Sequence, residues 1–272
     1  ADGHLHQDIK PGEVVAWPTN IGWMMGPWLI FAALINKATI ALYYGAPTDS
    51  RFGHFVEQAG IHMLGLIPSM VKRWLETDCM KGFDWSSIKV YSSTGESSNP
   101  QDYLWLMAKA GYKPVIEYCG GTEVGGGYFT GTVVQAASPA TFSTPALGLD
   151  VVVLDEEANP SEKGEVFLVP PSIGFSNTLV NKDHHKTYYE GVPSCPANTL
   201  GSMGTPLKAQ IKGLGHAPVL RRHGDEVRHV SGSFFRAHGR ADDTMNIGGI
   251  KTSSVEIERL LDLTEGVKET AA

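Results

Sequence analysis

Two short polar stretches contain the residue types that a nucleotide site needs. The first, SSTGESSNP at residues 92–100, combines a glycine with an acid and several small hydroxyl side chains. Glycine lets the backbone approach a ligand closely, and neighbouring backbone N–H groups can then cradle phosphate. The alternative is an ordinary turn from a strand into a helix, with Asn99 as the helix N-cap. Taken alone, the stretch favours this ordinary turn.

The second stretch, YCGGTEVGGGY at residues 118–128, has the same ambiguity. Thr122 offers a hydroxyl to a phosphate, and Glu123 offers the hard oxygen ligand that Mg²⁺ prefers. Gly120 and Gly121 bring the backbone close to a ligand. A glycine-rich β-turn is the alternative, and it is the structure we expect for residues 125–127.

Other polar residues give weaker signals. In HGDEV, residues 223–227, Asp225 follows a predicted turn and could accept hydrogen bonds from both hydroxyls of a ribose, although a solvated turn aspartate is commoner. His184 and His185 have no third ligand at a useful spacing, so a metal site is not favoured there. The histidines give no pattern of a catalytic triad either.

The elements around these stretches indicate an α/β fold with a largely parallel sheet and flanking helices. Strands that alternate with helices of this length are typical of βαβ units. Ligands of such sheets lie beyond the carboxyl ends of the strands, which selects the loops at 93–96 and 119–123. The predicted helices cover residues 27–35, 51–59, 68–75 and 100–110, and the predicted strands cover 39–44, 62–67, 88–92 and 114–118.

The pattern changes after residue 127. Short strands between turn residues, with no clear helix among them, predict a small antiparallel β-barrel over 128–240; its strands lie at 148–155, 164–170, 218–222 and 234–239. A third part, 241–272, begins with polar residues and leads into an amphipathic helix over 255–263. We therefore predict an α/β part at 1–127, a β-rich part at 128–240 and a short third part.

Composition narrows the class of partner. A net charge of −7 and a pI near 5.8 argue against a nucleic-acid surface. The longest apolar run, residues 23–35, is interrupted by Gly26 and Pro27 and is too short to span a bilayer. Three cysteines form neither a disulfide framework nor a metal pair, so we expect a reducing, intracellular compartment.

The order of the motifs is much more specific than any one of them. STGE, GGTE and HGDE are followed by GRADDTMNIGGIKTSSVEIE at residues 239–258, and TNIGWMMGPW stands at 19–28. This series resembles the adenylate-forming (AMP-binding) superfamily of acyl-CoA synthetases, peptide-synthetase adenylation domains and luciferases. The nearest likeness is to the acetyl-CoA synthetase branch and its plant peroxisomal acyl-activating enzymes. It covers nearly the whole chain.

The resemblance implies how an adenine ring would be held. Gly95, Glu96 and Ser97 would line one face of the ring. Many relatives have an aromatic residue where this chain has Cys119. The other face is therefore weaker here or is supplied by Tyr118.

The resemblance also implies the contacts to phosphate, metal and ribose. Thr122 and Glu123 match catalytic positions, where threonine bonds the α-phosphate and glutamate holds Mg²⁺. Asp225 and Arg240 would hold the ribose. Lys251 stands where the branch usually has arginine, and a point charge in place of a two-pronged guanidinium weakens a planar phosphate contact.

The acyl pocket implied by the resemblance favours an acid longer than acetate. Trp23, Met24, Met25 and Thr94 match positions that line it, and two methionines make an adaptable wall. Gly120 matches a tryptophan of enzymes restricted to acetate. Glycine there would leave room for a medium or bulky acyl chain.

The whole protein implied by the resemblance is a carboxylate–CoA ligase. It would form an acyl-adenylate from ATP and a small carboxylic acid, with Mg²⁺, and then acyl-CoA; a peroxisomal location follows from the resemblance alone. Asp242 matches the hinge of a mobile C-terminal α+β domain, of which 241–272 would be only the beginning. The phosphate loop and the catalytic lysine are expected outside this central piece, so the chain alone should be inactive.

Two alternatives remain open at the level of sequence. An adenylating enzyme of the same fold could pass its acyl group to a carrier protein instead of CoA. A truncated product could also act as a nucleotide-binding or interaction module without catalysis.

Overall fold

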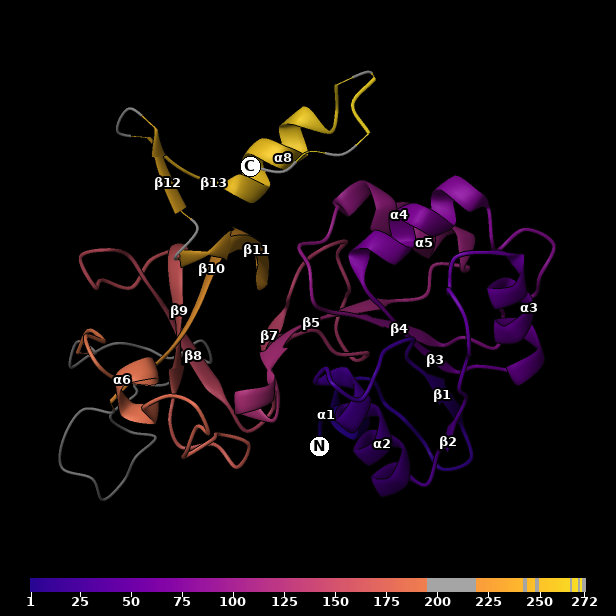
Figure 1. Ribbon diagram of the computed structural model, residues 1–272, viewed down its shortest axis with the longest axis horizontal. Coiled ribbons are helices and arrows are strands. Elements are labelled where there is room, and N and C mark those ends of the chain that lie inside the picture. Colours follow the sequence, from indigo (N-terminus) through magenta and orange to yellow (C-terminus); the bar gives the residue numbers. More distant parts are fainter. Residues whose placement is uncertain (195–218, 242–243, 248–249, 265, 269, 271–272) are drawn as a thin grey trace. The chain divides into compact units, whose positions relative to one another are not determined.

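The computed structural model describes residues 1–194, 219–241, 244–247, 250–264, 266–268 and 270, without the side chains of 242–253 and 256. The described residues fall into two compact units, Ala1–Leu147 and Gly148–Ala272 (Figure 1). None of the described helices is long and apolar enough to cross a membrane.

The first unit is built on a seven-stranded sheet of order β2-β1-β3-β4-β5-β6-β7. The first five strands in this order pair in parallel, and β6 and β7 are added antiparallel. The strands are β1 (Val14–Ala16), β2 (Thr39–Ile40), β3 (Met63–Leu66), β4 (Val90–Ser93), β5 (Val115–Gly121), β6 (Gly126–Thr130) and β7 (Thr144–Pro145). This confirms the predicted α/β class with a mainly parallel sheet.

Helices pack on both faces of this sheet, because successive side chains of its strands point to opposite faces. Leu64, Tyr91 and Val115 pack with helices α3, α4 and α5, whereas Met63 and Val90 pack with α2. The helices of this unit are α1 (Asp2–Leu5), α2 (Met25–Asn36), α3 (Ser50–Ala59), α4 (Pro68–Thr77) and α5 (Pro100–Lys109).

Local sequence sets the helix starts. The Asp49 side chain caps α3 by accepting from the backbone N–H groups of Arg51 and Phe52, and the Asn99 side chain caps α5. Pro68 and Pro100 occupy the first turn of α4 and α5, where the missing N–H costs nothing. Only α4 begins without a side-chain cap from its own N-cap residue, Ile67, among these three helices.

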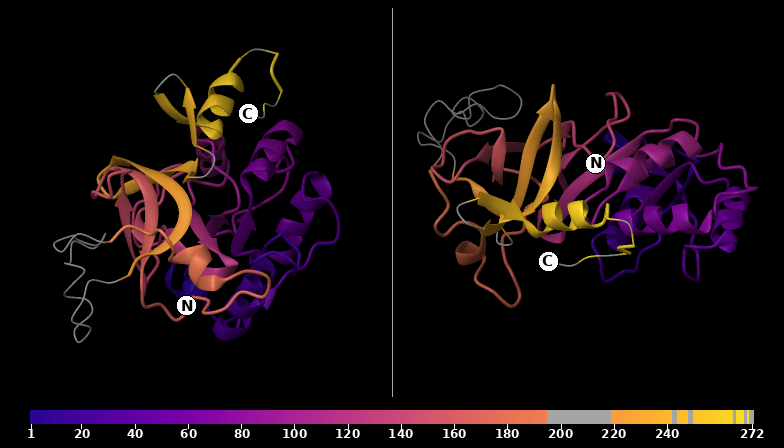
Figure 2. Two further views of the ribbon diagram at one scale, coloured as in Figure 1. Left: turned by 60° about the vertical axis from the view of Figure 1, so that its left-hand side comes forward. Right: turned by 90° about the horizontal axis from the view of Figure 1, so that it is seen from above.

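The second unit contains a four-stranded antiparallel sheet of order β11-β10-β9-β8. Its small core includes Val152, Leu154, Phe167 and Leu220. The strands are β8 (Asp150–Leu154), β9 (Lys163–Val169), β10 (Arg221–Ser231) and β11 (Phe234–Arg240); the curvature of β10 is visible in Figure 2. The described part of this unit also contains short helix α6 (His184–Tyr188), hairpin β12 (Thr244–Ile247)–β13 (Ile250–Ser253) and helix α8 (Ser254–Leu261).

Several details differ from the sequence-based prediction. The unit boundary lies at Leu147/Gly148, not near residue 127, because β6 and β7 extend the first sheet. The predicted barrel is an open sheet within the described residues, with β8 and β11 at its edges. The sequence patterns gave no sign of β1 or α6, and the strand predicted over 39–44 is only two residues long.

Candidate nucleotide and acyl site

The first candidate loop lies between β4 and α5. Gly95 has φ +96°, a left-handed conformation that a residue with a side chain adopts only with strain. Asn99 closes the loop by accepting a 2.8 Å hydrogen bond from the backbone N–H of Gln101. Ser97 is half-buried beside the exposed Gly95 and Glu96. The loop therefore starts helix α5 with Asn99 as its N-cap, as the ordinary-turn interpretation predicts, and Gly95 and Glu96 are exposed.

The Glu96 side chain has a partner outside its loop. Its carboxylate accepts hydrogen bonds from the backbone N–H of Ser69 at 2.8 Å and from Ser69 Oγ at 3.0 Å. Ser69 lies in the first turn of α4, where the helix dipole favours a negative charge. Glu96 thus supplies the cap that Ile67 cannot provide.

The second candidate loop follows β5. A short 3-10 turn, η1 (Thr122–Val124), connects β5 to β6. The Thr122 side chain is exposed and Glu123 is half-buried. The Glu123 carboxylate lies over Gly121: a Cβ on that glycine would come 2.5 Å from Glu123 Oε1. Glycine at position 121 is therefore needed for this position of the carboxylate.

The sheet brings the two loops to the same edge. Strands β4 and β5 are parallel neighbours, with Ser93 opposite Glu117 in their register. Both strands end within a few residues of this pair, so Thr94 and the start of the second loop lie beyond the same carboxyl ends. This is the place where ligands of parallel sheets bind.

The burial of the Tyr118 side chain argues against a contact between its ring and adenine. Its side chain is 2% exposed and packs edge-on against Trp28, with ring centroids 6.0 Å apart. Its hydroxyl donates to the Asp2 carboxylate, and burial raises its pKa well above the ordinary value. Cys119, on the opposite face of the strand, is half-buried, with Sγ 3.0 Å from the Tyr128 hydroxyl oxygen.

Asp2 fixes the β5–β6 hairpin that carries the second loop. Besides the Tyr118 hydroxyl, its carboxylate accepts a 3.1 Å hydrogen bond from the backbone N–H of Gly127. A side chain at Gly127 would collide with the Tyr118 ring, at 2.7 Å. The glycines of β6 therefore allow the close packing of the hairpin, and Gly126 and Gly127 are strand residues and not the turn expected from sequence.

The candidate acyl-pocket residues lie in different environments. Trp23 is 71% exposed, Met24 is half-buried at the N-cap of α2, and Met25 is in the core with 5% exposure. Thr94 is half-buried, and its backbone N–H donates to the Leu66 carbonyl at 3.4 Å. Gly120 is closely packed, because a Cβ there would lie 2.2 Å from the carbonyl oxygen of Gly126.

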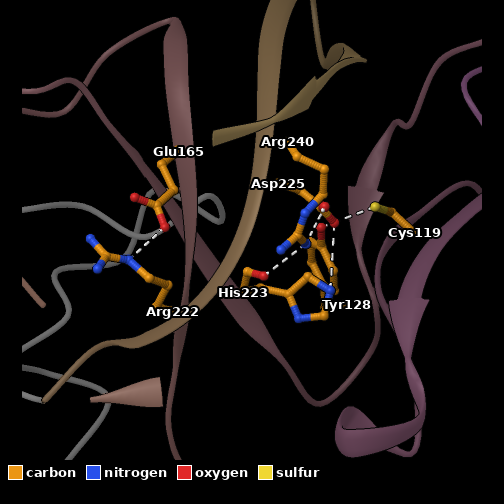
Figure 3. Close-up of polar contacts among 7 residues, drawn as sticks. All are labelled: Cys119, Tyr128, Glu165, Arg222, His223, Asp225 and Arg240. Atoms are coloured by element: carbon orange, nitrogen blue, oxygen red, sulfur yellow. Dashed lines mark hydrogen bonds and ion pairs between the residues drawn. The ribbon is translucent and has the colours of Figure 1, made fainter. Parts of the chain in front are cut away.

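The second unit brings Asp225 and Arg240 together. They are register partners on β10 and β11, and Arg240 Nη1 lies 3.1 Å from Asp225 Oδ1 (Figure 3). The pairing with β9 shifts between Arg222 and Glu226, so Asp225 lies in an irregular part of β10 and not after a turn. His223, which the sequence analysis did not single out, has Nε2 3.5 Å from Asp225 Oδ2.

Comparison with known proteins identifies the family. Residues 2–173 match the family model described as AMP-binding enzyme. The chain belongs to the AMP-binding enzyme family.

Relatives within the AMP-binding enzymes agree with the resemblance to plant acyl-activating enzymes. The hexanoyl-CoA synthase of Cannabis sativa and the probable peroxisomal acyl-activating enzyme 17 of Arabidopsis thaliana are each 48% identical over 278 residues, covering 100% of this chain. The chain spans 36% of the length of each of these relatives.

A solved structure shares the fold of this AMP-binding enzyme chain. The acetoacetyl-CoA synthetase of Streptomyces lividans aligns with a TM-score of 0.80 over 98% of this chain and 40% of that one, at 22% identity. At this sequence identity, the likeness confirms the fold alone.

Two predicted residues of the C-terminal part cannot be placed in full. Lys251 pairs with Asn246 across the β12–β13 hairpin, and its side chain lies outside the described part of the structure. Asp242, the expected hinge residue, lies outside the described residues altogether.

Proposed function

We propose that this chain is the central part of a carboxylate–CoA ligase. In the first step a carboxylate oxygen attacks the α-phosphorus of ATP, an acyl–phosphate bond forms, and pyrophosphate leaves with the electron pair. In the second step the sulfur of CoA attacks the acyl carbon, a thioester forms, and AMP leaves. The observation that carries the proposal is the position of two glycine-containing loops beyond the carboxyl ends of β4 and β5 in a member of the AMP-binding family.

Each loop has a defined part in this proposal. The backbone around Gly95 and Ser97 provides a surface for the adenine ring, and Cys119 lies at the other face in place of an aromatic residue. The Thr122 hydroxyl bonds the α-phosphate. In such transfers catalysis consists mainly of positioning and of stabilising charge on the phosphoryl oxygens, so an exposed hydroxyl at a fixed turn suits this role.

The Asp225–Arg240 pair is the proposed ribose site. Asp225 can accept hydrogen bonds from both ribose hydroxyls, because a carboxylate has two acceptor oxygens. Arg240 already holds one of these oxygens at 3.1 Å and thereby orients the carboxylate. Lys251 is the proposed phosphate contact of the C-terminal part, with Asp242 as the hinge.

Glu123 suits a magnesium ion shared with substrate. Mg²⁺ in phosphate-transfer sites is held by one or two carboxylates together with substrate phosphates and water. In the described part of the chain no group of three His, Cys, Asp or Glu side chains could hold a metal by itself. A single half-buried carboxylate in the loop after β5 fits the shared arrangement, in which the ion would neutralise developing charge.

The proposed substrate is a carboxylic acid longer than acetate. By the resemblance, Gly120 leaves a pocket floor without a side chain, although the Gly126 carbonyl lies close to Gly120 in this structure. Met24 offers an adaptable wall. The name of the Cannabis sativa relative, a hexanoyl-CoA synthase, supports the same choice. We also propose a peroxisomal location, supported by the name of the Arabidopsis thaliana relative.

The experiment compares the complete protein with residues 1–272 alone. Pyrophosphate release is measured with ATP, Mg²⁺, CoA and carboxylates from acetate to decanoate. We expect acid-dependent release from the complete protein and none from the chain alone, because the triphosphate loop and the catalytic lysine are expected outside it. Loss of one such donor typically lowers the rate roughly 10²–10³-fold. Turnover or micromolar ATP binding by residues 1–272 would contradict this expectation.

A further inference from the structure

We infer that Ser69 is a positioning residue for the nucleotide, acting through Glu96. The two residues form a strut between the N-terminus of α4 and the loop after β4. The inference deepens the proposed function and rests on it: if the backbone around Gly95 is the adenine surface, the strut determines where that surface lies.

The strut has two hydrogen bonds with different donors. Glu96 Oε2 accepts from the Ser69 backbone N–H at 2.8 Å, and Oε1 accepts from Ser69 Oγ at 3.0 Å. Both oxygens of the carboxylate are therefore engaged by one residue. Two bonds from one residue fix the direction of the Glu96 side chain and, through it, the position of the loop backbone at residue 96.

Helix α4 is a rigid support for this strut. Trp74 is fully buried and donates from Nε1 to the Pro47 carbonyl at 2.6 Å, and Thr77 Oγ1 donates to the Thr48 carbonyl at 2.8 Å. Met70 and Val71 lie in the core of the first unit. The helix is thus fixed along its length, and a group bonded to its first turn is fixed with it.

The loop itself is anchored at both of its ends. The Ser93 hydroxyl bonds the Tyr103 hydroxyl at the end of β4, and Asn99 caps α5. Between these points Gly95 has a left-handed backbone conformation, which glycine adopts without strain. Glu96 is the described residue between these two anchors whose side chain ties the loop to α4. Removal of the strut should leave the strands intact and let the loop move.

Positioning and direct contact by Glu96 predict different results. If Glu96 acts through Ser69, Ser69→Ala weakens ATP binding although Ser69 touches no nucleotide, and Ser69→Ala adds nothing in the Glu96→Ala background. If Glu96 instead contacts adenine directly and does not hold the loop, Glu96→Ala weakens ATP binding without faster amide exchange at residues 95–98. Glu96→Gln keeps an acceptor without the charge and should lie between wild type and Glu96→Ala.

The matched control is the cap of α3. Asp49 accepts from the backbone N–H groups of Arg51 and Phe52 at the start of a helix as long as α4, ten residues. Asp49→Ala should lower stability about as much as Glu96→Ala, because both remove an N-terminal helix cap. It should leave ATP binding unchanged, because the described hydrogen bonds of the Asp49 side chain go to Arg51 and Phe52 at the start of α3.

The test has two arms. In the complete protein we expect the KM for ATP to rise roughly tenfold in Glu96→Ala and about threefold in Ser69→Ala, with kcat changed less than about twofold. In residues 1–272, amide hydrogen exchange should accelerate at residues 95–98 in both variants and not in Asp49→Ala. Unchanged exchange at 95–98, or a KM that responds to Glu96→Ala but not to Ser69→Ala, would overturn the inference. Absence of ATP turnover in the wild-type complete protein would instead refute the proposed function, and the exchange arm would still decide whether the strut fixes the loop.

Discussion

The guanidinium of Arg240 bonds the Asp225 carboxylate across the β10–β11 ladder, with Nη1 3.1 Å from Oδ1. The same nitrogen donates to the His223 carbonyl at 3.1 Å. Gly224 makes this possible: it has φ +90°, and a Cβ there would lie 2.8 Å from Arg240 Nη2. The glycine of the HGDEV motif is therefore the residue over which Arg240 lies.

We predict that Asp225→Ala and Arg240→Ala in the complete protein raise the KM for ATP. The expected change is about tenfold or more, since a hydrogen bond to a charged group contributes roughly 1.5–3 kcal/mol. The free energy of unfolding should change by less than about 1 kcal/mol, because the Arg240 side chain is 45% exposed. Steady-state kinetics and urea unfolding measure the two effects separately.

A second ion pair on the same sheet serves as the control. Arg222 Nε lies 2.8 Å from Glu165 Oε1, with side-chain exposures of 40% and 17% that resemble those of the Asp225 pair (Figure 3). Burial raises the pKa of Glu165 above its ordinary value, and the Arg222 contact opposes that shift. Arg222→Ala should leave the KM for ATP unchanged. An equal rise in both variants would mean that the sheet, and not a ribose contact, is responsible.

The parallel sheet could be predicted from sequence because local signals agree there with the fold. Asn99-Pro100 marks the start of α5, and hydrophobic runs such as Met63–Leu66 are buried on both faces, as in parallel sheets. The positions of the loops then follow from the rule for carboxyl ends of strands. The C-terminal helix was also located, with α8 beginning at Ser254.

What could not be predicted depends on contacts distant in sequence. The capping of α4 by Glu96 joins residues 27 positions apart, and the burial of Tyr118 depends on Asp2, 116 positions away. Neither contact has a local signature. The strand over Asp225 was missed because Gly224 looks like a turn residue, whereas here it relieves a collision inside a strand. His223 could have been noticed from its place in the same motif.

Glu123 is predicted to set the requirement for magnesium. In the complete protein, Glu123→Gln should raise the Mg²⁺ concentration needed for half-maximal pyrophosphate release about tenfold, because an amide oxygen lacks the charge of a carboxylate. Glu157→Gln changes an exposed acid in the β8–β9 connection and should have no effect. An unchanged magnesium requirement in Glu123→Gln would remove Glu123 from the site.

Gly120 is predicted to tolerate no side chain without movement of β6. Gly120→Ala should lower the free energy of unfolding by about 1–3 kcal/mol, because its Cβ would lie 2.2 Å from the Gly126 carbonyl oxygen. Gly131→Ala is the control, since the nearest atom to a Cβ there is 3.6 Å away. If Gly120→Ala is as stable as wild type, the space at this position is larger than the structure indicates. Gly120→Trp would then test which length of acyl chain the proposed pocket accepts.

The first unit should lose stability in mild acid through His6. The imidazole is fully buried; Nδ1 lies 2.9 Å from the Gly131 carbonyl oxygen, and Nε2 accepts from the Leu147 N–H at 3.0 Å. Burial lowers the pKa of His6 below its ordinary value near 6.5. The unfolded chain therefore binds a proton that the folded chain does not, and stability falls as pH drops below about 6.5 towards the folded pKa.

Urea unfolding of residues 1–272 at pH 7.5 and pH 5.5 measures this dependence. His6→Gln should lower stability at both values, by about 1–3 kcal/mol if one of its buried partners is left unsatisfied. It should also make the difference between the two pH values smaller. A variant that keeps the full wild-type difference would assign the acid sensitivity to other groups.

Product analysis of the complete protein shows whether it is a carboxylate–CoA ligase. The protein is incubated with ATP, Mg²⁺, CoA and an equimolar mixture of acetate, hexanoate and decanoate, and the products are identified by mass spectrometry. We predict acyl-CoA, AMP and pyrophosphate in equal amounts, with hexanoyl- or decanoyl-CoA in excess over acetyl-CoA. Formation of ADP in place of AMP, or no acyl-CoA from any of the three acids, would contradict this prediction.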